Sequence, residues 1–445
     1  MNNARRDFFK FLGGSAAAVA FTPVPWKLLD DVSIWTQNWS WIPRPVRGEI
    51  TYKAAACTLC PMGCPVRVRC SGAQPVAVLP ASAEGGLCAY GLASHQVRYQ
   101  PGRITAGNPD AALAAVTDAM NAGRSIAILD AWPGRVASAM YGRFAASVKN
   151  GAHLAAYPAG NTGPDLRRVR TLVSFGVPVL EDWGPPNLLL RRRDEVRIIY
   201  VGTQFSLTAE LADRWVPGIT DELIEDLKNN GPSVAVGSTY EAARLNALLG
   251  DKAALVHRRE SLPAPRSISG VADRSIGLLI AETPSVPFEA VKPKLAPDAV
   301  VIAFAAWPND YTASAQHVLP AAAPFETIED VPASFDAAAA SFRLTPALMQ
   351  ASFLTPADFL ARALPSLGSL EENRTKRIAA IHKDRRGTMD GKPIRDLSLE
   401  DFTSALQDGA AWIDDETRSK NPPSVDIPGT RRLLAHKPLL AGRFA

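Results

Sequence analysis

Four cysteines give the sequence its clearest chemical signal. Cys57, Cys60 and Cys64 have the spacing Cys-x2-Cys-x3-Cys, and Cys88 follows after 23 further residues. Thiolates are soft ligands that suit either zinc or an iron-sulfur cluster. Three closely spaced cysteines with one remote cysteine favour a 4Fe-4S cluster, because zinc ribbons usually pair two Cys-x2-Cys loops. Zinc and disulfide bonds are the alternatives for the same residues.

The fifth cysteine and the histidines do not extend this signal. Cys70 ends the alternating stretch Val66-Arg-Val-Arg-Cys70. A period of two is typical of a strand with one buried face, so we expect Cys70 in the core. The six histidines are dispersed, without His-x3-His or Glu-x2-His spacing. A second metal site is therefore not expected.

The amino terminus has the pattern of an export signal. The pair Arg5-Arg6 is followed by Asp-Phe-Phe-Lys and by a short apolar run from Phe11 to Phe21. This resembles a twin-arginine signal, which directs folded proteins out of the cytoplasm. The run is too short for an ordinary membrane span. Residues 1–30 are therefore predicted to be a signal, or a small anchor if retained, and the protein is expected on the periplasmic side of the inner membrane.

A tryptophan-rich segment follows the signal. Trp35, Trp39 and Trp41 lie in residues 31–50 together with Pro43 and Pro45, without the period of a helix or a strand. Aromatic side chains bury large areas at interfaces, so we expect this arm to pack against the protein itself or a partner subunit.

The rest of the chain predicts an α/β fold. A length of 445 residues suggests two or three domains. Short apolar runs between residues 107 and 370 alternate with helical patterns, as in parallel sheets covered by helices on both faces. The expected strands are Ser125 to Leu129, Ile198 to Val201, Ser233 to Val236, Ile276 to Ile280 and Val300 to Phe304. The expected helices include Pro109 to Asn121, Leu207 to Trp215, Asp221 to Asn229 and Ala242 to Leu249. Residues 371–445 are interpreted as a charged tail.

The composition excludes other classes of protein. Hydrophobic residues make up 47% of the chain and charged residues 21%, which is typical of a folded globular protein and not of a disordered one. There are 48 Lys and Arg against 44 Asp and Glu, spread along the chain. Because nucleic-acid binding usually needs a concentrated basic face, no nucleic-acid partner is expected.

Two stretches resemble the molybdopterin oxidoreductase superfamily. The loop Cys57-Thr-Leu-Cys-Pro-Met-Gly-Cys64, with Gly86-Leu-Cys-Ala-Tyr-Gly91 and Tyr99-Gln-Pro-Gly-Arg103, is similar to the amino-terminal cluster domain of that family. The stretch from Asp310 to Pro320, with Glu326, is similar to the entry into its third domain. The tryptophan-rich arm resembles the shortened subunit of membrane quinone-linked complexes, namely the quinone reductase complex and alternative complex III.

The resemblance implies a fold and a cofactor. It implies a small iron-sulfur lobe over residues 51–106, with a 4Fe-4S cluster on the four cysteines, followed by parallel-sheet α/β domains over residues 107–370. The sequence departs from the family at Tyr90, where a Lys or Arg commonly bridges the cluster to a pterin. There is also no cysteine after Cys88 that could serve as a ligand to molybdenum. The C-terminal β-barrel that helps to clamp the pterins is expected to be missing. We therefore expect no molybdopterin.

These features predict an electron-transfer and scaffold subunit of a periplasm-facing membrane quinone oxidoreductase complex. Such a subunit is not expected to be catalytic alone. The resemblance implies ferredoxin-like, cytochrome c and integral membrane quinone-binding subunits as partners. One alternative is a small molybdenum or tungsten bis-pterin oxidoreductase acting on a periplasmic substrate. The other is a zinc-stabilised or cofactor-free structural subunit.

Replacing Arg5 and Arg6 by Lys is expected to strand folded protein in the cytoplasm, because the export receptor reads the arginine pair. Fractionation of cells that express the unaltered and the altered chain measures this effect. Normal periplasmic location of the altered chain would show that the amino terminus is not such a signal.

Overall fold

The structure is a computed structural model. It describes residues 3–21, 48–60, 63–81, 86–155, 162–175, 179–181, 186–203, 205–237, 240–257, 265–282, 288–332, 340–349, 351 and 353–414. The chain divides into two units, Met1–Glu49 and Ile50–Ala445.

In the first unit, α1 (Asn3–Phe21) covers most of the predicted signal. The rest of that signal, and the tryptophan-rich arm up to residue 47, lie outside the described residues. None of the helices described here is both long enough and apolar enough to cross a membrane.

A three-stranded antiparallel sheet opens the second unit. It has the order β1 (Ile50–Ala56), β2 (Pro65–Ser71), β3 (Gln74–Pro80). In β2 the residues alternate between exposed and buried, and the face with Val66, Val68 and Cys70 lies in the core. The short helices α3 (Ala89–Leu92) and η1 (Ser94–Tyr99) follow. This sheet occupies the range predicted for the iron-sulfur lobe.

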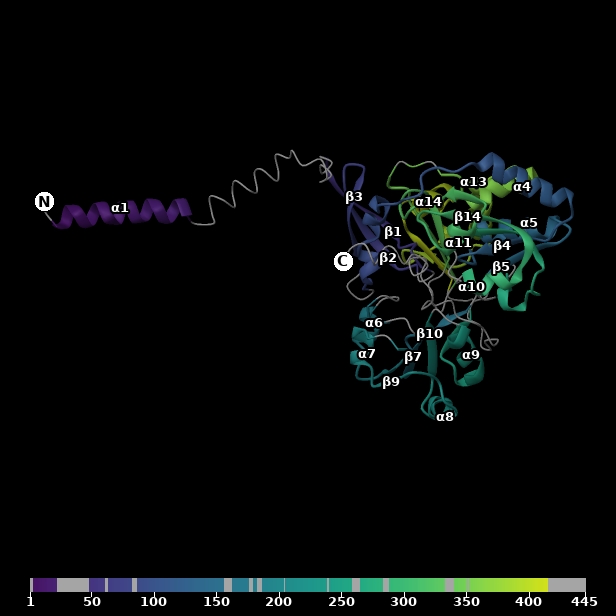
Figure 1. Cartoon of the computed structure of the whole chain (residues 1–445), viewed down its shortest axis with the longest axis horizontal. Helices are drawn as coiled ribbons and strands as arrows, with labels where there is room; N and C mark the ends of the chain where they lie inside the picture. Colours follow the sequence, from purple (N-terminus) through teal and green to yellow (C-terminus); the bar gives the residue numbers. More distant parts are fainter. Residues whose placement is uncertain are drawn as a thin grey trace. The chain divides into compact units, whose positions relative to one another are not determined.

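A six-stranded parallel sheet forms the centre of the second unit (Figure 1). Its order is β12 (Arg266–Ser267), β5 (Gly151–Ala155), β4 (Ile126–Asp130), β13 (Ile276–Glu282), β14 (Leu295–Ala305), β15 (His317–Pro320). Successive residues of β4 point to opposite faces, and all are buried. One face packs against α4 (Pro109–Asn121), α5 (Val136–Ser147) and α12 (Pro356–Ala363), and the other against α10 (Phe288–Val291) and α11 (Asp310–Ser314).

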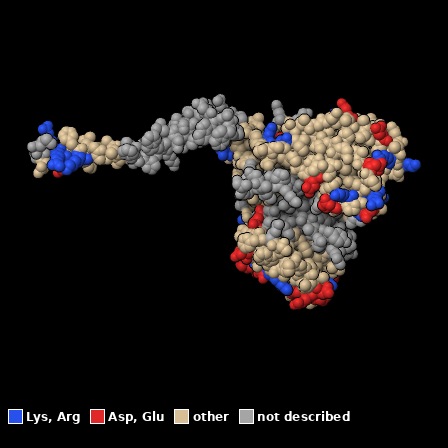
Figure 2. Space-filling model, in the orientation of Figure 1, with Lys and Arg blue, Asp and Glu red and all other residues tan. Residues whose placement is uncertain are grey.

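A second parallel sheet has four strands. Its order is β10 (Ser233–Gly237), β7 (Thr171–Phe175), β8 (Arg197–Val201), β9 (Arg214–Val216). The helices in this part of the chain are α6 (Pro186–Leu190), α7 (Leu207–Leu211), α8 (Asp221–Asn229) and α9 (Tyr240–Leu249). Leu223 and Leu227 of α8 belong to the core of this sheet, and the acidic residues of α8 form a red group on the face shown in Figure 2. Elsewhere on that face, basic and acidic side chains are interspersed.

The C-terminal part of the described chain differs from the predicted tail. Residues 370–414 form α13 (Leu370–Lys383), β18 (Thr388–Met389), β19 (Lys392–Pro393), α14 (Leu399–Gln407) and β20 (Ala411–Asp414). With β16 (Glu329–Pro332) and β17 (Ala340–Thr345), the three strands make a five-stranded antiparallel sheet in the order β16-β17-β20-β18-β19. The buried faces of α13 and α14 hold Ile378, Ile381, Phe402 and Leu406. Except for the buried Arg374, the charged residues of these two helices are at least partly exposed. Residues 415–445 lie outside the described chain.

The remaining elements are short. A two-stranded antiparallel sheet joins β6 (Thr162–Pro164) to β11 (Leu255–His257). The other 3-10 helices are η2 (Gly250–Lys252), η3 (Ile268–Gly270), η4 (Lys292–Lys294), η5 (Pro365–Leu367) and η6 (Ile394–Asp396).

The prediction of an α/β fold with parallel sheets is confirmed. Each of the five expected strands is present within a few residues of its predicted bounds. Three of the four expected helices are present, whereas the fourth, predicted over Leu207 to Trp215, ends at Leu211 and gives way to β9. The missing C-terminal barrel and the iron-sulfur character of the first lobe stay predictions.

One side chain joins the first sheet to the five-stranded sheet. The hydroxyl of Thr345, at the end of β17, accepts a hydrogen bond from the backbone N–H of Ala56 at 3.0 Å and donates one to the carbonyl of Ala56 at 3.1 Å. Both residues are fully buried. The end of β1, directly before Cys57, is therefore held by a strand about 290 residues later in the chain.

Thr345→Val is expected to lower the free energy of unfolding by about 1–3 kcal/mol, because it leaves two buried backbone groups of Ala56 without partners. Thr375→Val is the matched control. The Thr375 hydroxyl also donates to a backbone carbonyl, but at an exposed position, so its loss should cost no more than about 0.5 kcal/mol. Equal denaturation midpoints for the two variants would contradict the role given to Thr345.

Candidate functional site

Strand pairing brings the cysteine segments to one end of the first sheet. Ala56 at the end of β1 pairs with Pro65 at the start of β2, so residues 57–64 form the connection of this hairpin. Val66 of β2 pairs with Pro80 at the end of β3, so the chain that leads to Cys88 leaves the sheet at the same end. The N–H of Cys57 donates to the carbonyl of Cys64 at 2.8 Å and closes the hairpin connection.

All four predicted ligands are buried. Only 4–8% of the surface of each residue is exposed in the case of Cys57, Cys60, Cys64 and Cys88. Cys88 is the N-cap of α3, and its Sγ accepts a hydrogen bond from the N–H of Gly91 at 3.4 Å. Backbone N–H groups on ligand sulfurs are among the contacts that tune iron-sulfur clusters.

The fit to a cluster rests on the kind and position of the donors. Among the residues that the structure describes, no three or more His, Cys, Asp or Glu side chains are gathered as a metal site. The donor set fits a 4Fe-4S cluster in its chemistry, since it consists of four buried thiols on two segments at one end of one sheet. Cys57, Cys60, Cys64 and Cys88 are the residues that would hold the cluster, and this ligand set stays a prediction.

The structure separates Cys70 from the other cysteines. Cys70 lies within β2 on the face that carries Val66 and Val68, and it belongs to the same apolar core. Burial raises the pKa of its thiol, and the nearby charge of Lys53 only partly opposes this. The prediction that Cys70 is a core residue is confirmed. Tyr90, which replaces the expected cation, is partly buried and packs against this core.

The five-stranded sheet places an arginine beside the hairpin connection. Arg343 of β17 lies close enough to Cys64 for their charges to interact. Burial lowers the pKa of Arg343, whereas the charges of Cys64 and Asp390 act in the opposite direction. Nothing in the sequence pattern indicated this neighbour, because 278 positions separate the two residues.

The two stretches that carry the family resemblance contact each other. Glu326 is buried, and its Oε2 forms an ion pair with Arg103. Its other carboxylate oxygen, Oε1, lies 3.5 Å from Nε of Arg98. The N–H of Ala323 also donates to Oε2 at 2.7 Å. The N–H of Ile104 donates to the carbonyl of Ala306 at 2.9 Å. The segment after the fourth cysteine is therefore fastened to the segment that follows the central sheet.

A buried charge network, which the sequence did not predict, lies at the carboxyl edge of the six-stranded sheet. Asp130 ends β4 and Glu282 ends β13, and Arg135 lies between them. Arg135 donates from Nη1 to Glu282 Oε1 at 2.9 Å, from Nη2 to Glu282 Oε2, and from Nη2 to Asp130 Oδ1 at 3.1 Å. His153 Nε2 lies 3.0 Å from the other oxygen of Asp130.

Neighbouring charges and hydrogen bonds keep Asp130 and Arg135 of this network charged. Burial alone would raise the pKa of Asp130, but the hydrogen bond from His153 and the charges of Arg135 and His153 hold it well below its ordinary value. Burial would lower the pKa of Arg135, but the charges of Glu282 and Asp130 hold it well above its ordinary value. Asp130 and Arg135 are therefore a pair of opposite charges at neutral pH.

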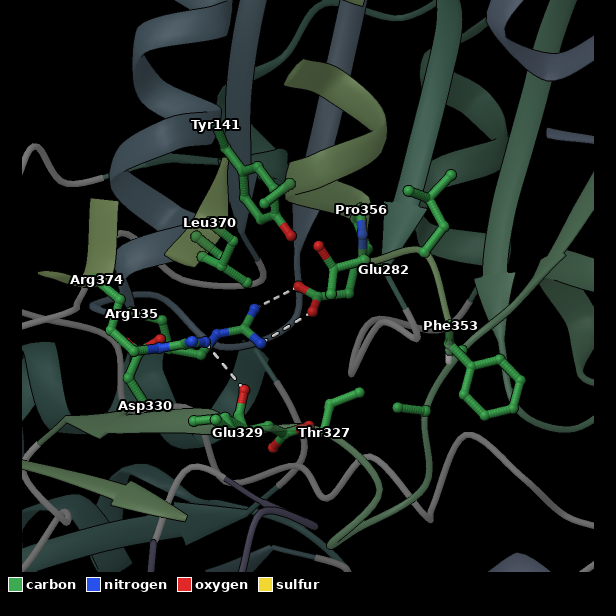
Figure 3. Close-up of a pocket in the computed structure, with 17 residues that line it drawn as sticks. Arg135, Tyr141, Glu282, Thr327, Glu329, Asp330, Phe353, Pro356, Leu370 and Arg374 are labelled. Carbon is green, nitrogen blue, oxygen red and sulfur yellow. Dashed lines mark hydrogen bonds and ion pairs between the residues drawn. The ribbon is translucent and has the colours of Figure 1, made fainter. Parts of the chain in front are cut away.

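The network lies at the switch point of the sheet. The chain runs from β4 to β5 on one side, and from β13 through β14 to β15 on the other. In open α/β sheets, ligands usually bind in the crevice at the carboxyl ends of the two strands where the order reverses. The described part of that crevice holds a cavity of about 80 Å³, lined by residues that include Arg135, Glu282, Tyr141, Phe353 and Arg374. Figure 3 shows Arg135 and Glu282 pointing toward each other along its wall.

Comparison with known proteins supports the resemblance. No protein-family model matches the chain. The molybdopterin-binding-like subunit of menaquinone reductase from Nitratidesulfovibrio vulgaris is 30% identical over 259 residues. The chain is similar to a quinone reductase subunit. The match covers 48% of this chain and 37% of the relative. This similarity supports a relationship to molybdopterin-oxidoreductase-related quinone reductases.

Arg135→Met is expected to lower the free energy of unfolding by about 3–5 kcal/mol, because it leaves the carboxylates of Asp130 and Glu282 in the interior without their cation. Chemical denaturation measures the loss. Arg124→Met is the matched control, since Arg124 pairs with the exposed Asp298 and should cost no more than about 1 kcal/mol. A loss for Arg135→Met as small as that of the control would contradict this description of the network.

Proposed function

We propose that the protein is an electron-transfer and scaffold subunit of a membrane quinone oxidoreductase complex, with one 4Fe-4S cluster on Cys57, Cys60, Cys64 and Cys88. The proposal rests on four buried cysteines carried by two segments that both leave the same end of the first sheet. The similarity to a menaquinone reductase subunit supports the assignment to a quinone-linked complex.

The surroundings of the four cysteines are suited to a 4Fe-4S cluster that transfers electrons. A 4Fe-4S cluster, when bound, accepts and releases one electron. Burial of the four cysteines keeps water away from the predicted ligands, and the N–H of Gly91 donates to Cys88 Sγ, a contact of the kind that tunes iron-sulfur clusters. The hydrogen bonds of Thr345 to Ala56 hold the start of the cysteine segment in place.

We further propose that the subunit binds no molybdopterin. The carboxylates of Asp130 and Glu282 occupy the carboxyl edge where a phosphate group would bind, and they would repel it. Arg135 is committed to these carboxylates and is not available for an anionic ligand.

The cellular setting is part of the same proposal. The arginine pair in α1 supports export by the twin-arginine route, with the subunit on the periplasmic side of the inner membrane. The expected partners are ferredoxin-like, cytochrome c and integral membrane quinone-binding subunits. In this arrangement the protein passes electrons within the complex and does not act on a substrate alone.

The unaltered protein, purified from its native host, is expected to contain close to four irons per chain and less than about 0.1 molybdenum or tungsten. Cys60→Ala should lose most of the iron, because it removes one of four ligands. Cys70→Ala is the matched control, a buried cysteine of the same lobe that should leave the iron content unchanged. Metal analysis and visible absorbance provide the measurement.

Three outcomes would contradict the proposal. Zinc in place of iron would favour the structural alternative. Stoichiometric molybdenum with an extractable pterin would favour the small enzyme. Loss of iron from Cys70→Ala that equals the loss from Cys60→Ala would show that the ligand set is misassigned.

A further inference from the structure

The two faces of β17 have different surroundings. Phe342 and Leu344 belong to the core formed with α13, α14 and β20. Side chains alternate along a strand, so Arg343 and Thr345 share the opposite face. Thr345 on that face binds both backbone groups of Ala56, directly before the first cysteine. The face of β17 that carries Arg343 is therefore turned toward the cysteine hairpin.

Strand pairing fixes the position of Arg343 more closely. Val331 of β16 pairs with Arg343. A methyl group built on Gly63 would lie 2.7 Å from Cγ1 of Val331, and Gly63 has a φ of +56°. Gly63 directly precedes Cys64, so β16 and β17 cover this end of the hairpin connection. The electrostatic interaction between Arg343 and Cys64 agrees with this placement.

Arg343 has the charge that residue 90 lacks. Tyr90 packs against the apolar core shared by the first sheet and the four-stranded sheet, and a tyrosine side chain carries no positive charge. The guanidinium of arginine stays protonated throughout the physiological range. Arg343 is only partly exposed, so water and salt screen its charge less than that of a surface residue.

We propose that Arg343 is the cation that sets the reduction potential of the cluster, delivered from β17 in place of residue 90. This inference rests on the proposed function, since it requires a cluster on the four cysteines. Reduction adds one negative charge to the cluster, and a fixed positive charge nearby stabilises the reduced form relative to the oxidised form. Arg343 thereby raises the midpoint potential without binding the metal.

The experiment uses the full-length chain purified with its cluster. Iron content and the midpoint potential, from a redox titration followed by electron paramagnetic resonance, are measured for the unaltered protein and for Arg343→Gln, Arg343→Lys and Arg69→Gln. The last variant is the control, because Arg69 is an exposed arginine of β2 in the same lobe.

Arg343→Gln is expected to lower the ratio of reduced to oxidised cluster about tenfold at a fixed potential, a shift of about 59 mV for a one-electron couple. Arg343→Lys, which keeps the charge, should restore most of the unaltered midpoint. Arg69→Gln should move the midpoint far less, because solvent screens an exposed charge.

The results separate the two proposals. An unchanged midpoint in Arg343→Gln with full iron content would overturn the role of Arg343 and leave the proposed function intact. A lack of iron in the unaltered protein would overturn the proposed function itself. Partial loss of iron does not hide the shift, because the titration reads only the loaded fraction. If Arg343→Gln holds no cluster, the midpoint potential of Asp390→Asn is measured in its place. Removal of this carboxylate, whose charge acts on Arg343, should make the midpoint more positive. An unchanged midpoint would overturn the proposal.

Discussion

Antiparallel pairing of three short strands is the constraint on which the candidate site depends. The pairing of Ala56 with Pro65, and of Val66 with Pro80, requires both cysteine-bearing segments to start from the same end of the sheet. A shift of the register by one residue would turn Val66, Val68 and Cys70 out of the core, so the buried face fixes the pairing strongly. The position of the cysteine segments thus follows from ordinary packing of a small apolar face.

The rest of the chain holds this end of the sheet in place. Thr345 binds Ala56, Val331 covers Gly63, and Trp132 lies in the same small apolar group as Ala56 and Val331. The backbone of Trp132 is in turn fixed by Asp130 and Arg135, which belong to the charge network of the six-stranded sheet. The network therefore connects the carboxyl edge of the central sheet to the cysteine hairpin.

Those parts of the fold that depend on local sequence could be predicted. Strands such as β4 and β13 are buried on both faces, so they read as continuous apolar runs, and α4 has both its apolar period and its Asn108 cap in the local sequence. The cysteine spacing is equally local. The burial of Cys70 could also be predicted, because it follows from the alternation of β2.

The remaining features depend on contacts between distant segments. The strands β18 and β19 have two residues each, and β20 pairs with β17 about 70 residues earlier, so the charged composition of residues 370–414 concealed a folded segment. Arg135 meets Glu282 and Arg103 meets Glu326 only after the sheets have formed. An isolated Arg or Glu carries no local signal of its partner. Arg343 is a further case, since its pairing with Val331 and its electrostatic interaction with Cys64 both join segments far apart in the chain.

Mössbauer spectroscopy of the full-length protein, purified from cells grown on 57Fe, tests most directly whether the four cysteines hold one 4Fe-4S cluster. This measurement reports the ligands and oxidation state of every iron atom, whatever the activity of the complex. A single cubane population is expected, in which all iron is sulfur-coordinated and one electron is taken up on reduction. Isolated iron sites, a two-iron cluster or a lack of bound iron would contradict the assignment of Cys57, Cys60, Cys64 and Cys88 as the ligands of one 4Fe-4S cluster.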